Sequence, residues 1–345
     1  MKILVTGDRG YIGSVLTGML IDRGYEVAGY DTGYYMENIL SPGAYQYKQI
    51  SKDIRDIDLE DVEGFDAVIH LAGLSNDPLG ALDPRLTEQI NYRATVKLAK
   101  LAKAAGVCRF IYSSSQSMYG VSKTDDELDE DKSEKNPVTI YASTKWQAEL
   151  KLRELADSGF TVVAFRPSTV FGASPRLRCD IVYNSLVGCA YTTGKIEIKS
   201  DGTPWRPVVH IRDVSSAFIA GLEAPLDLVA NQSFNVGIPD GNFTVRDLAV
   251  AAQRVVKGSK LIFTGEHGSD SRTYRVSFKK ILTVLKDYFK PEWDLIRGGE
   301  ELVAFFNKIK FTEEQFRGRM TNRLKQLEYM IQSQELDKEL RHNKR

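Results

Sequence analysis

Short apolar runs alternate with amphipathic stretches through the first half of the chain. The apolar runs are typical of buried strands, and the stretches between them repeat apolar residues at helical spacing. Strands that alternate with helices are joined by right-handed crossovers, so we expect an α/β fold with a doubly wound parallel sheet. The pattern predicts helices at Ile12–Arg23 and Leu86–Ala105 and strands at Lys2–Val5, Glu26–Tyr30, Asp66–Leu71, Arg109–Tyr112 and Thr161–Phe165.

The alternation breaks down beyond about Phe171, where prolines punctuate shorter elements. We expect residues 1–170 to form one doubly wound domain, with later strands returning to it near residues 205–237. Residues 171–295 would form mainly a smaller lobe. Residues 296–345 are charged and predict a helical extension that is either solvated or packed against a partner. A basic patch that binds a ligand is the alternative for this extension.

Composition excludes several classes of protein. Among 345 residues, 46 Lys and Arg balance 46 Asp and Glu, which argues against a nucleic-acid binder. No stretch approaches the ~20 apolar residues of a membrane span. The first residues enter a strand directly and lack the pattern of a secretory signal. Three cysteines without CxxC spacing do not indicate disulfides or a structural metal site, so we expect a cytoplasmic protein without a metal.

A glycine-rich segment, TGDRGYIG at residues 6–13, joins the first strand to the first helix. Its glycines allow a tight turn and let backbone N–H groups approach a pyrophosphate at the helix N-terminus. The second strand ends at Asp31, where a carboxylate can bind both ribose hydroxyls of an adenosine and repel a 2′-phosphate. The pattern predicts NAD. Arg9 keeps NADP as an alternative, because a guanidinium can bind a 2′-phosphate; a turn without a ligand is the other alternative.

A second polar group follows a later strand. Ser113, Ser114 and Ser115 come directly after RFIY, and Tyr141 and Lys145 lie further on, where a helix is expected to begin. Residues four apart share one helical face, and a cation beside a phenol lowers its pKa. We therefore expect Tyr141 to act as an acid or base, with Ser115 holding the reacting oxygen. The spacing Tyr-x-x-x-Lys alone is typical of any amphipathic helix. Its place in the chain after the glycine loop and the serines is what indicates a catalytic site.

These motifs resemble those of the extended short-chain dehydrogenase/reductases, in the NAD-dependent nucleotide-sugar epimerase/dehydratase family. The resemblance covers about residues 1–290 and is carried by TGDRGYIG, HLAGLSNDP, SSSQSMYG, YASTK, RPSTVFG and DGTPWRPVVHIRDV. It implies a Rossmann domain with a smaller C-terminal substrate-binding lobe. It also implies a bound NAD, a nucleotide-diphosphate sugar as substrate, and a homodimer formed through two long helices of the first domain.

The resemblance assigns roles to individual residues. Ser115, Tyr141 and Lys145 match the catalytic triad, and Arg206 matches an arginine that binds the diphosphate of the substrate. Cofactor contacts are implied for Gly7, Arg9, Gly10, Tyr11, Ile12, Gly13, Asp31, Asp53, Ile54, Leu71, Ala72, Gly73, Tyr141, Lys145 and Pro167. Substrate contacts are implied for Ser75, Ser115, Gln116, Thr169, Arg206 and Arg272. Arg176 and Arg178 either reach a phosphate or a sugar acid, or lie in a solvated loop.

Departures from the family pattern narrow the reaction. The 4,6-dehydratases carry an Asp-Glu pair after the catalytic serine or threonine, whereas this chain has Gln116 and Ser117, which cannot serve as an acid/base pair. Ser117 also stands where 3,5-epimerases use a cysteine. Hydride transfer at one sugar carbon, most often C4, remains, and 4-epimerisation is the expected outcome. A 4-ketoreductase or 4-dehydrogenase is the alternative, and a catalytically silent dinucleotide-binding sensor is a more distant one.

Overall fold

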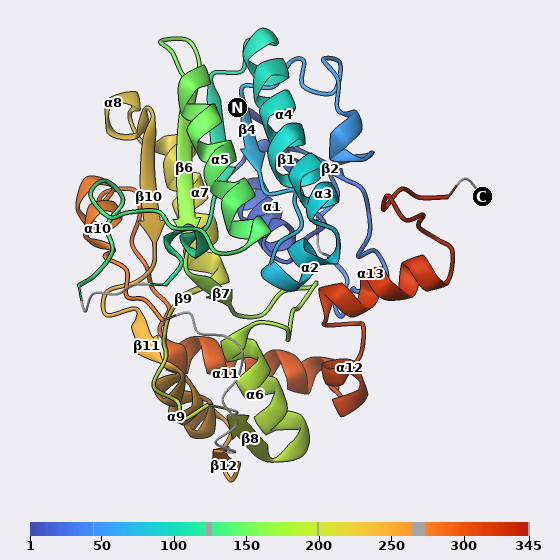
Figure 1. The fold of residues 1–345 in the computed structure, drawn as a ribbon, viewed down its shortest axis with the longest axis vertical. Helices are drawn as coiled ribbons and strands as arrows, with labels where there is room; N and C mark the ends of the chain where they lie inside the picture. Colours follow the sequence, from blue (N-terminus) through green and yellow to red (C-terminus); the bar gives the residue numbers. More distant parts are fainter. Residues whose placement is uncertain (44, 122–125, 199, 264–272, 344–345) are drawn as a thin grey trace.

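A seven-stranded parallel sheet forms the centre of the protein (Figure 1), seen in a computed structural model that describes residues 1–43, 45–121, 126–198, 200–263 and 273–343. The strand order is β10-β6-β5-β4-β1-β2-β3, and every neighbouring pair is parallel. The expected doubly wound α/β fold is therefore confirmed. The strands are β1 (Lys2–Thr6), β2 (Glu26–Asp31), β3 (Lys48–Ser51), β4 (Ala67–His70), β5 (Arg109–Ser113), β6 (Thr161–Pro167) and β10 (Gln232–Val236).

Helices cover both faces of this sheet because alternate side chains of each strand point to opposite faces. In β1, Ile3 and Val5 join the core under one set of helices, whereas Leu4 joins the core under the other. The first set comprises α1 (Gly13–Asp22), α7 (Ile211–Glu223) and α10 (Lys279–Val284). The second set comprises α4 (Ala94–Ala104) and α5 (Ile140–Leu155). The short α8 (Leu226–Val229) precedes β10.

The expectation of one continuous helix at Leu86–Ala105 is wrong. The segment contains α3 (Pro84–Thr87), a π-helical stretch at Glu88–Arg93, called η2, and only then α4. The extra residue of a π-turn rotates the side chains around it, and such turns are frequent at functional sites. Here the turn carries Asn91, whose side chain reaches the loop that follows β4. The short α2 (Asp77–Leu82) lies between that loop and α3.

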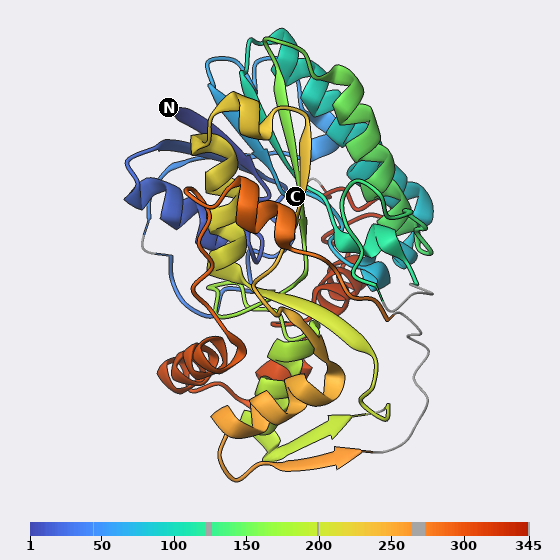
Figure 2. The same cartoon turned by 90° about the vertical axis from the view of Figure 1, so that its left-hand side faces the viewer.

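A smaller lobe lies beside the carboxyl ends of the central strands (Figure 2). It holds a three-stranded sheet, β11-β9-β7, and a two-stranded sheet, β12-β8. Of the strands expected near residues 205–237, β10 pairs with β6 in the central sheet, whereas β9 pairs with β7 and β11 in the lobe. The elements of the lobe are β7 (Thr169–Phe171), α6 (Val182–Thr193), β8 (Lys195–Ile198), β9 (Trp205–His210), β11 (Asn242–Thr244), α9 (Val245–Val255), β12 (Lys260–Phe263), α11 (Leu295–Ile309) and α12 (Glu313–Arg317).

The last helix, α13 (Arg323–Gln332), returns from the small lobe to the central sheet domain (Figure 1). Leu327 and Met330 of α13 are buried in the same core as α4 and α5. The C-terminal residues that follow α13 add Leu336 and Leu340 to this core. The end of the chain therefore packs against the domain in which the chain begins. Within the described ranges, no helix combines the length and the apolar character needed to cross a bilayer.

Candidate active site

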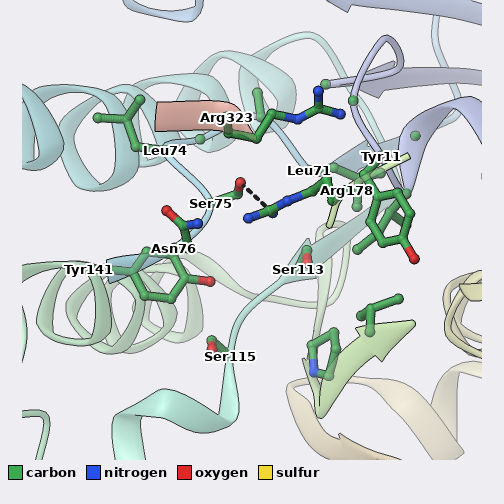
Figure 3. Close-up of a pocket in the computed structure, with 18 of the residues that line it drawn as sticks. Tyr11, Leu71, Leu74, Ser75, Asn76, Ser113, Ser115, Tyr141, Arg178 and Arg323 are labelled. Atoms are coloured by element: carbon green, nitrogen blue, oxygen red, sulfur yellow. Dashed lines mark hydrogen bonds between the residues drawn. The ribbon is translucent and has the colours of Figure 1, made fainter. Parts of the chain in front are cut away.

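A cavity of about 470 Å³ lies at the carboxyl ends of the central strands (Figure 3). Its lining includes residues at or just after the ends of five parallel strands: Gly7, Asp31, Leu71, Ser113 and Pro167. Ligands of doubly wound folds bind in this position, outside the carboxyl ends of the strands. The small lobe contributes Thr169 from β7 and Arg206 from β9 to the opposite wall. The cavity therefore joins the two parts of the molecule.

Most of the residues selected from the sequence lie around this single cavity. Arg9 and Gln116 are not among its lining residues, and Arg272 lies outside the described residues. The selected residues that line it are Gly7, Gly10, Tyr11, Ile12, Gly13, Asp31, Asp53, Ile54, Leu71, Ala72, Gly73, Ser75, Ser115, Tyr141, Lys145, Pro167, Thr169 and Arg206.

The glycine loop is held by backbone packing that leaves no room for a side chain. Gly7 has a positive φ of 76°, and a Cβ there would lie 2.7 Å from the backbone nitrogen of Ala72. A Cβ on Gly13 would lie 2.1 Å from the carbonyl oxygen of Gly7. In the described structure no side chain caps the N-terminus of α1 at Ile12. Ile12 and Gly13, at this uncapped N-terminus, line the cavity, an arrangement that favours a phosphate.

Asp31 and Arg9 lie side by side but point to different neighbours. Asp31 Oδ1 accepts a hydrogen bond of 2.7 Å from the Gly33 N–H, and Oδ2 accepts one of 3.3 Å from the Arg9 N–H. The Arg9 guanidinium instead donates to Ser51 Oγ at 2.9 Å and Gln49 Oε1 at 2.8 Å on β3. Burial raises the pKa of Asp31, and the Gly33 N–H and the Arg9 charge oppose this shift.

Asp53 is held by its own sequence neighbours. It caps η1, a 3₁₀ turn at Ile54–Asp56, by accepting a 2.8 Å hydrogen bond from the Arg55 N–H. Its carboxylate also forms an ion pair of 2.6 Å with the Arg55 guanidinium. Burial raises the pKa of Asp53, but the hydrogen bonds and charge of Arg55 outweigh it, so the pKa lies below its usual value. This turn lies next to Asp31 on the cavity wall.

The three consecutive serines have three different environments. The Ser113 carbonyl accepts a 2.8 Å hydrogen bond from Lys145 Nζ. Ser114 Oγ donates to Glu149 Oε2 at 2.7 Å, inside a fully buried ion pair between Glu149 and Arg166. Ser115 Oγ lines the cavity and shares a 2.8 Å hydrogen bond with Ser117 Oγ. Ser115 thus differs from Ser114, whose hydroxyl is engaged by the buried ion pair.

Tyr141 lies in the first turn of α5, where Thr139 caps the helix by accepting a hydrogen bond from the Ala142 N–H at 3.2 Å. Its hydroxyl points toward Ser115 (Figure 3). Burial raises the pKa of Tyr141 to about 12, although a hydrogen bond with Ser115 lowers it. Lys145, one turn further on, is 5 % exposed, and burial lowers its pKa to about 8.

The expectation that Tyr141 has a lowered pKa beside Lys145 is wrong, because burial raises this pKa. The Lys145 ammonium is directed to the carbonyl of Ser113, and the loss of water around Tyr141 dominates its titration. A buried phenol stays protonated at neutral pH unless a further positive charge enters its surroundings.

Gln116 is turned away from the cavity. It is 1 % exposed, its Nε2 donates to the carbonyl of Arg166 at 2.9 Å, and its Oε1 accepts a 3.1 Å hydrogen bond from Ser168 Oγ. This side chain therefore fixes η3, the 3₁₀ turn at Gln116–Tyr119, against β6 and the residue that follows it.

Two further arginines line the cavity: Arg178, which the sequence left with two alternatives, and Arg323, which the sequence analysis missed. Arg178, weighed above as solvated or anion-binding, is 6 % exposed, pairs with Asp180 at 2.8 Å and donates to Ser75 Oγ at 3.0 Å (Figure 3). Arg323 comes from α13 and is 2 % exposed. No local pattern distinguishes Arg323 from the other charged residues of the tail. Tyr34 and Tyr35 also line the cavity. Their position shortly after Asp31 was a signal in the sequence from which they could have been predicted as cavity residues.

Comparison with known proteins agrees with this geometry. Residues 3–237 match the NAD dependent epimerase/dehydratase family, and the chain belongs to this family. It is 30 % identical over 342 residues to a UDP-glucose 4-epimerase of Bacillus subtilis (strain 168), with 88 % of this chain and 95 % of that protein covered. It is also 30 % identical over 322 residues to a UDP-glucose 4-epimerase of Mycolicibacterium smegmatis, with 89 % and 98 % covered.

A solved structure supports the same assignment. MoeE5 in complex with UDP-glucose and NAD is 25 % identical to this chain and superimposes with a TM-score of 0.75, covering 89 % of this chain and 99 % of MoeE5. The protein is thus an enzyme of an NAD-dependent family, and NAD is its cofactor. The glycine loop without space for a Cβ, the uncapped N-terminus of α1 and the carboxylate at the end of β2 fit this cofactor.

Proposed function

We propose that the protein is a nucleotide-sugar 4-epimerase that acts by hydride transfer at C4 of a sugar linked to a nucleoside diphosphate. The observation that carries this proposal is the position of Ser115, Tyr141 and Lys145 around the same cavity as the glycine loop and Asp31. The names of the two curated relatives support the choice of C4 and favour UDP as the nucleotide.

The side chains suggest how the reaction proceeds. Tyr141 takes the proton of the sugar hydroxyl and later returns it, while Ser115 donates a hydrogen bond to the same oxygen. Lys145 orients the site through its bond to the Ser113 carbonyl and adds positive charge beside it. Bound NAD would supply the site that holds the hydride between its two transfers, and the positive charge of the oxidised ring would lower the pKa of a neighbouring phenol. Arg206, on the wall formed by the small lobe, would bind the substrate diphosphate.

The buried Gln116 supports hydride transfer without dehydration. Its amide is fully engaged with Arg166 and Ser168, so the position next to Ser115 supplies neither an acid nor a base. A 4-ketoreductase or a 4-dehydrogenase would use the same three catalytic side chains. These alternatives differ from an epimerase in that the cofactor must be exchanged after each turnover.

We also propose a cytoplasmic homodimer. The packed pair α4 and α5 forms an outer layer of the central domain and exposes Leu150, which is 42 % exposed. Two such helix pairs can form a four-helix interface across a twofold axis. The free thiols of Cys108, Cys179 and Cys189 suit a reducing compartment. Sedimentation equilibrium of the purified protein should give twice the mass of the chain, and the mass of a single chain would contradict the homodimer.

The catalytic proposal is tested by incubating the protein with the glucose and galactose esters of UDP, dTDP, GDP and CDP, with and without added NAD or NADH. Nuclear magnetic resonance then follows the sugar protons, and absorbance follows the reduced nicotinamide. We expect the C4 epimer to accumulate to equilibrium without net formation or consumption of NADH. Stoichiometric formation of NADH would identify a dehydrogenase. Consumption of NADH when a 4-keto sugar nucleotide is supplied would identify a reductase. Loss of water from C6 would overturn the proposal.

A further inference from the structure

The C-terminal segment, residues 319–343, packs beside the cofactor cavity and contributes Arg323 to its lining. It lies over the residues that follow β2: Asn38 Nδ2 donates to the carbonyl of Arg319 at 2.7 Å, and the Tyr34 hydroxyl donates to the carbonyl of Leu340 at 2.5 Å. This segment lies beyond the part of the chain that matches the family, which ends at residue 237. Its contacts bring the first residue of α13, Arg323, to the cavity wall.

Arg323 is buried without full satisfaction of its donors. Its Nη2 donates to the carbonyl of Arg176 at 2.7 Å, and its guanidinium carbon lies 4.3 Å from the centroid of the Tyr35 ring. Its Nη1 is buried and, among the described residues, has no hydrogen-bond partner. A buried donor without a partner costs about 1–3 kcal/mol, and more when it is charged. Such a group needs an explanation, and an absent anion is one.

Arg323 lies near two further buried arginines, Arg176 and Arg178, and the charge of Asp180 acts on it as well. Arg178 is balanced by a bidentate ion pair with Asp180, at 2.8 and 3.0 Å. In the described part of the chain, no ion pair to a carboxylate includes Arg176 or Arg323, although both are buried. Burial lowers the pKa of Arg323 to about 10, so the guanidinium is still charged at neutral pH. A buried charge without a direct ion pair is costly, and a bound anion would relieve this cost.

The position of this charge selects the anion. Figure 3 shows Arg178 and Arg323 on the side of the cavity between Leu74 and Tyr11. Tyr11 belongs to the glycine loop, and the N-terminus of α1 at Gly13 faces the same space. A helix N-terminus and a guanidinium fork are two complementary ways of binding phosphate oxygens. A diphosphate bound at the loop would lie within the field of both.

We propose that Arg323 is a cofactor-binding residue that donates to a phosphate oxygen of the dinucleotide diphosphate. By this contact the C-terminal segment holds the cofactor in its cavity. The inference rests on the proposed placement of NAD along the glycine loop. It explains why a charged tail returns from the small lobe to bury an arginine at the cavity. A retained cofactor also suits an epimerase, which regenerates its NAD in every turnover.

The test uses isothermal titration calorimetry on the full chain stripped of cofactor, with NAD, ADP and adenosine as probes. Arg323→Gln is compared with the original protein and with Arg317→Gln, which removes an exposed arginine of the same region that pairs with Glu313. We expect Arg323→Gln to weaken NAD and ADP about 10- to 100-fold, or roughly 1.4–2.8 kcal/mol, and to leave adenosine unchanged. Arg317→Gln should bind all three probes normally.

Three results would overturn the inference. Unchanged affinities for NAD and ADP would show that Arg323 does not reach the diphosphate. An equal loss of affinity for adenosine would show that Arg323 supports the adenosine pocket and does not bind the diphosphate. A loss confined to UDP in a parallel titration would assign it to the substrate. If the original protein binds no NAD, the proposed function fails as well, so the two failures are distinguishable.

A second measurement covers the case in which the glutamine variant folds poorly. Arg323→Lys keeps the charge but replaces the fork by a single ammonium group. The rise in unfolding temperature that saturating NAD produces should be smaller in Arg323→Lys than in the original protein, while the unfolding temperature without NAD stays the same. An undiminished rise would count against the diphosphate contact.

Discussion

Single residues of the cavity show how burial sets the chemistry of a group. Tyr141 is half-buried and Tyr112 is buried, and both lie near Lys145. Of the two, Tyr141 lines the cavity and contacts Ser115. The Tyr112 hydroxyl is buried without a hydrogen-bond partner in the described structure. The two residues therefore provide a matched pair for testing which phenol acts on substrate.

Tyr141→Phe should lower turnover by about two to four orders of magnitude, because it removes a positioned acid/base, and should leave NAD affinity nearly unchanged. Tyr112→Phe deletes the same atom from a phenol that contacts no ligand, so its turnover should stay within about threefold of the original protein. Steady-state kinetics and NAD titrations check both variants. Near-normal turnover of Tyr141→Phe would remove this residue from the mechanism.

Asp31 should set the preference for NAD over NADP. Asp31→Ala should weaken NAD by about 10- to 100-fold, or roughly 1.4–2.8 kcal/mol, and should narrow the gap to NADP because the repulsion of a 2′-phosphate is lost. Arg9→Gln should change the ratio little, because the Arg9 guanidinium is bound to Ser51 and Gln49. Calorimetry measures both cofactors. Tighter binding of NADP by the original protein would assign the preference to Arg9.

Asp8, inside the glycine loop, should make stability depend on pH. It is fully buried, its Oδ2 accepts a 2.9 Å hydrogen bond from Tyr47, and its Oδ1 has no partner among the described residues. Burial, and next the charge of Asp31, raise its pKa to about 6. The folded protein therefore holds this proton more tightly than the unfolded chain, and stability falls as pH rises from about 4 to 6.

Asp8→Asn should raise the free energy of unfolding by about 1–3 kcal/mol at pH 7.5 and change it little near pH 4. Urea denaturation across this range checks the slope. The exposed Asp287→Asn serves as the control, because it should leave the pH dependence unchanged. An equal gain at both pH values for Asp8→Asn would show that the ionisation of Asp8 is not the cause.

At the scale of elements, the π-helical stretch η2 explains how the loop after β4 is fixed. Asn91 Oδ1 accepts a 2.8 Å hydrogen bond from the Leu74 N–H, and its Nδ2 donates to the Leu74 carbonyl at 3.0 Å. One amide thus satisfies both backbone groups of a buried residue. Gly73 packs so close that a Cβ there would lie 3.0 Å from Asn91 Oδ1. A regular helix would turn this side chain away from the loop.

Asn91→Ala should lower the free energy of unfolding by about 2–4 kcal/mol, since each orphaned backbone group costs about 1–3 kcal/mol. It should also weaken NAD several-fold, because Ala72 and Gly73 of the released loop line the cavity. Arg93→Ala, an exposed change in the same stretch, is the control. Urea denaturation and calorimetry report the two effects. A stability loss without any change in NAD affinity would separate this loop from the cofactor site.

At the scale of the whole molecule, the chain crosses between its two parts several times. It leaves the central sheet after β6 and returns to it for α7 and β10, then for α10, and finally for α13. The small lobe has its own core, which includes Phe171, Tyr183 and Phe306, whereas α13 joins the core of the central domain. Cofactor binding is therefore expected to order segments that are far apart in the sequence.

Hydrogen exchange followed by mass spectrometry should detect this coupling. Saturating NAD should slow exchange in the glycine loop and also in residues 319–332, because Arg323 of this segment lines the same cavity as the loop. Exchange in α9, which lies in the small lobe away from the cavity lining, should not change. Protection confined to the glycine loop would show that the C-terminal segment responds to the cofactor little or not at all.

Local patterns were sufficient for much of this protein. The five strands and the first helix begin and end within a residue or two of their expected positions. An apolar run marks a strand, and a glycine marks the end of an element, through interactions between residues that are close in sequence. The glycine loop, the acidic strand end and the Tyr141–Lys145 spacing likewise depend on turn and helix geometry alone. These features predicted the doubly wound fold and the family.

Other features were decided only when distant segments packed together. The π-turn at Glu88–Arg93, the buried amide of Gln116, the raised pKa of Tyr141 and the return of Arg323 to the cavity all depend on contacts between residues far apart in sequence. Burial controls each of them, because the cost of removing a polar group from water depends on the groups that surround it in three dimensions. The spacing of residues in the sequence determines which side chains are candidates for the site. Only the packed structure decides which of them are removed from water and which can contact a ligand.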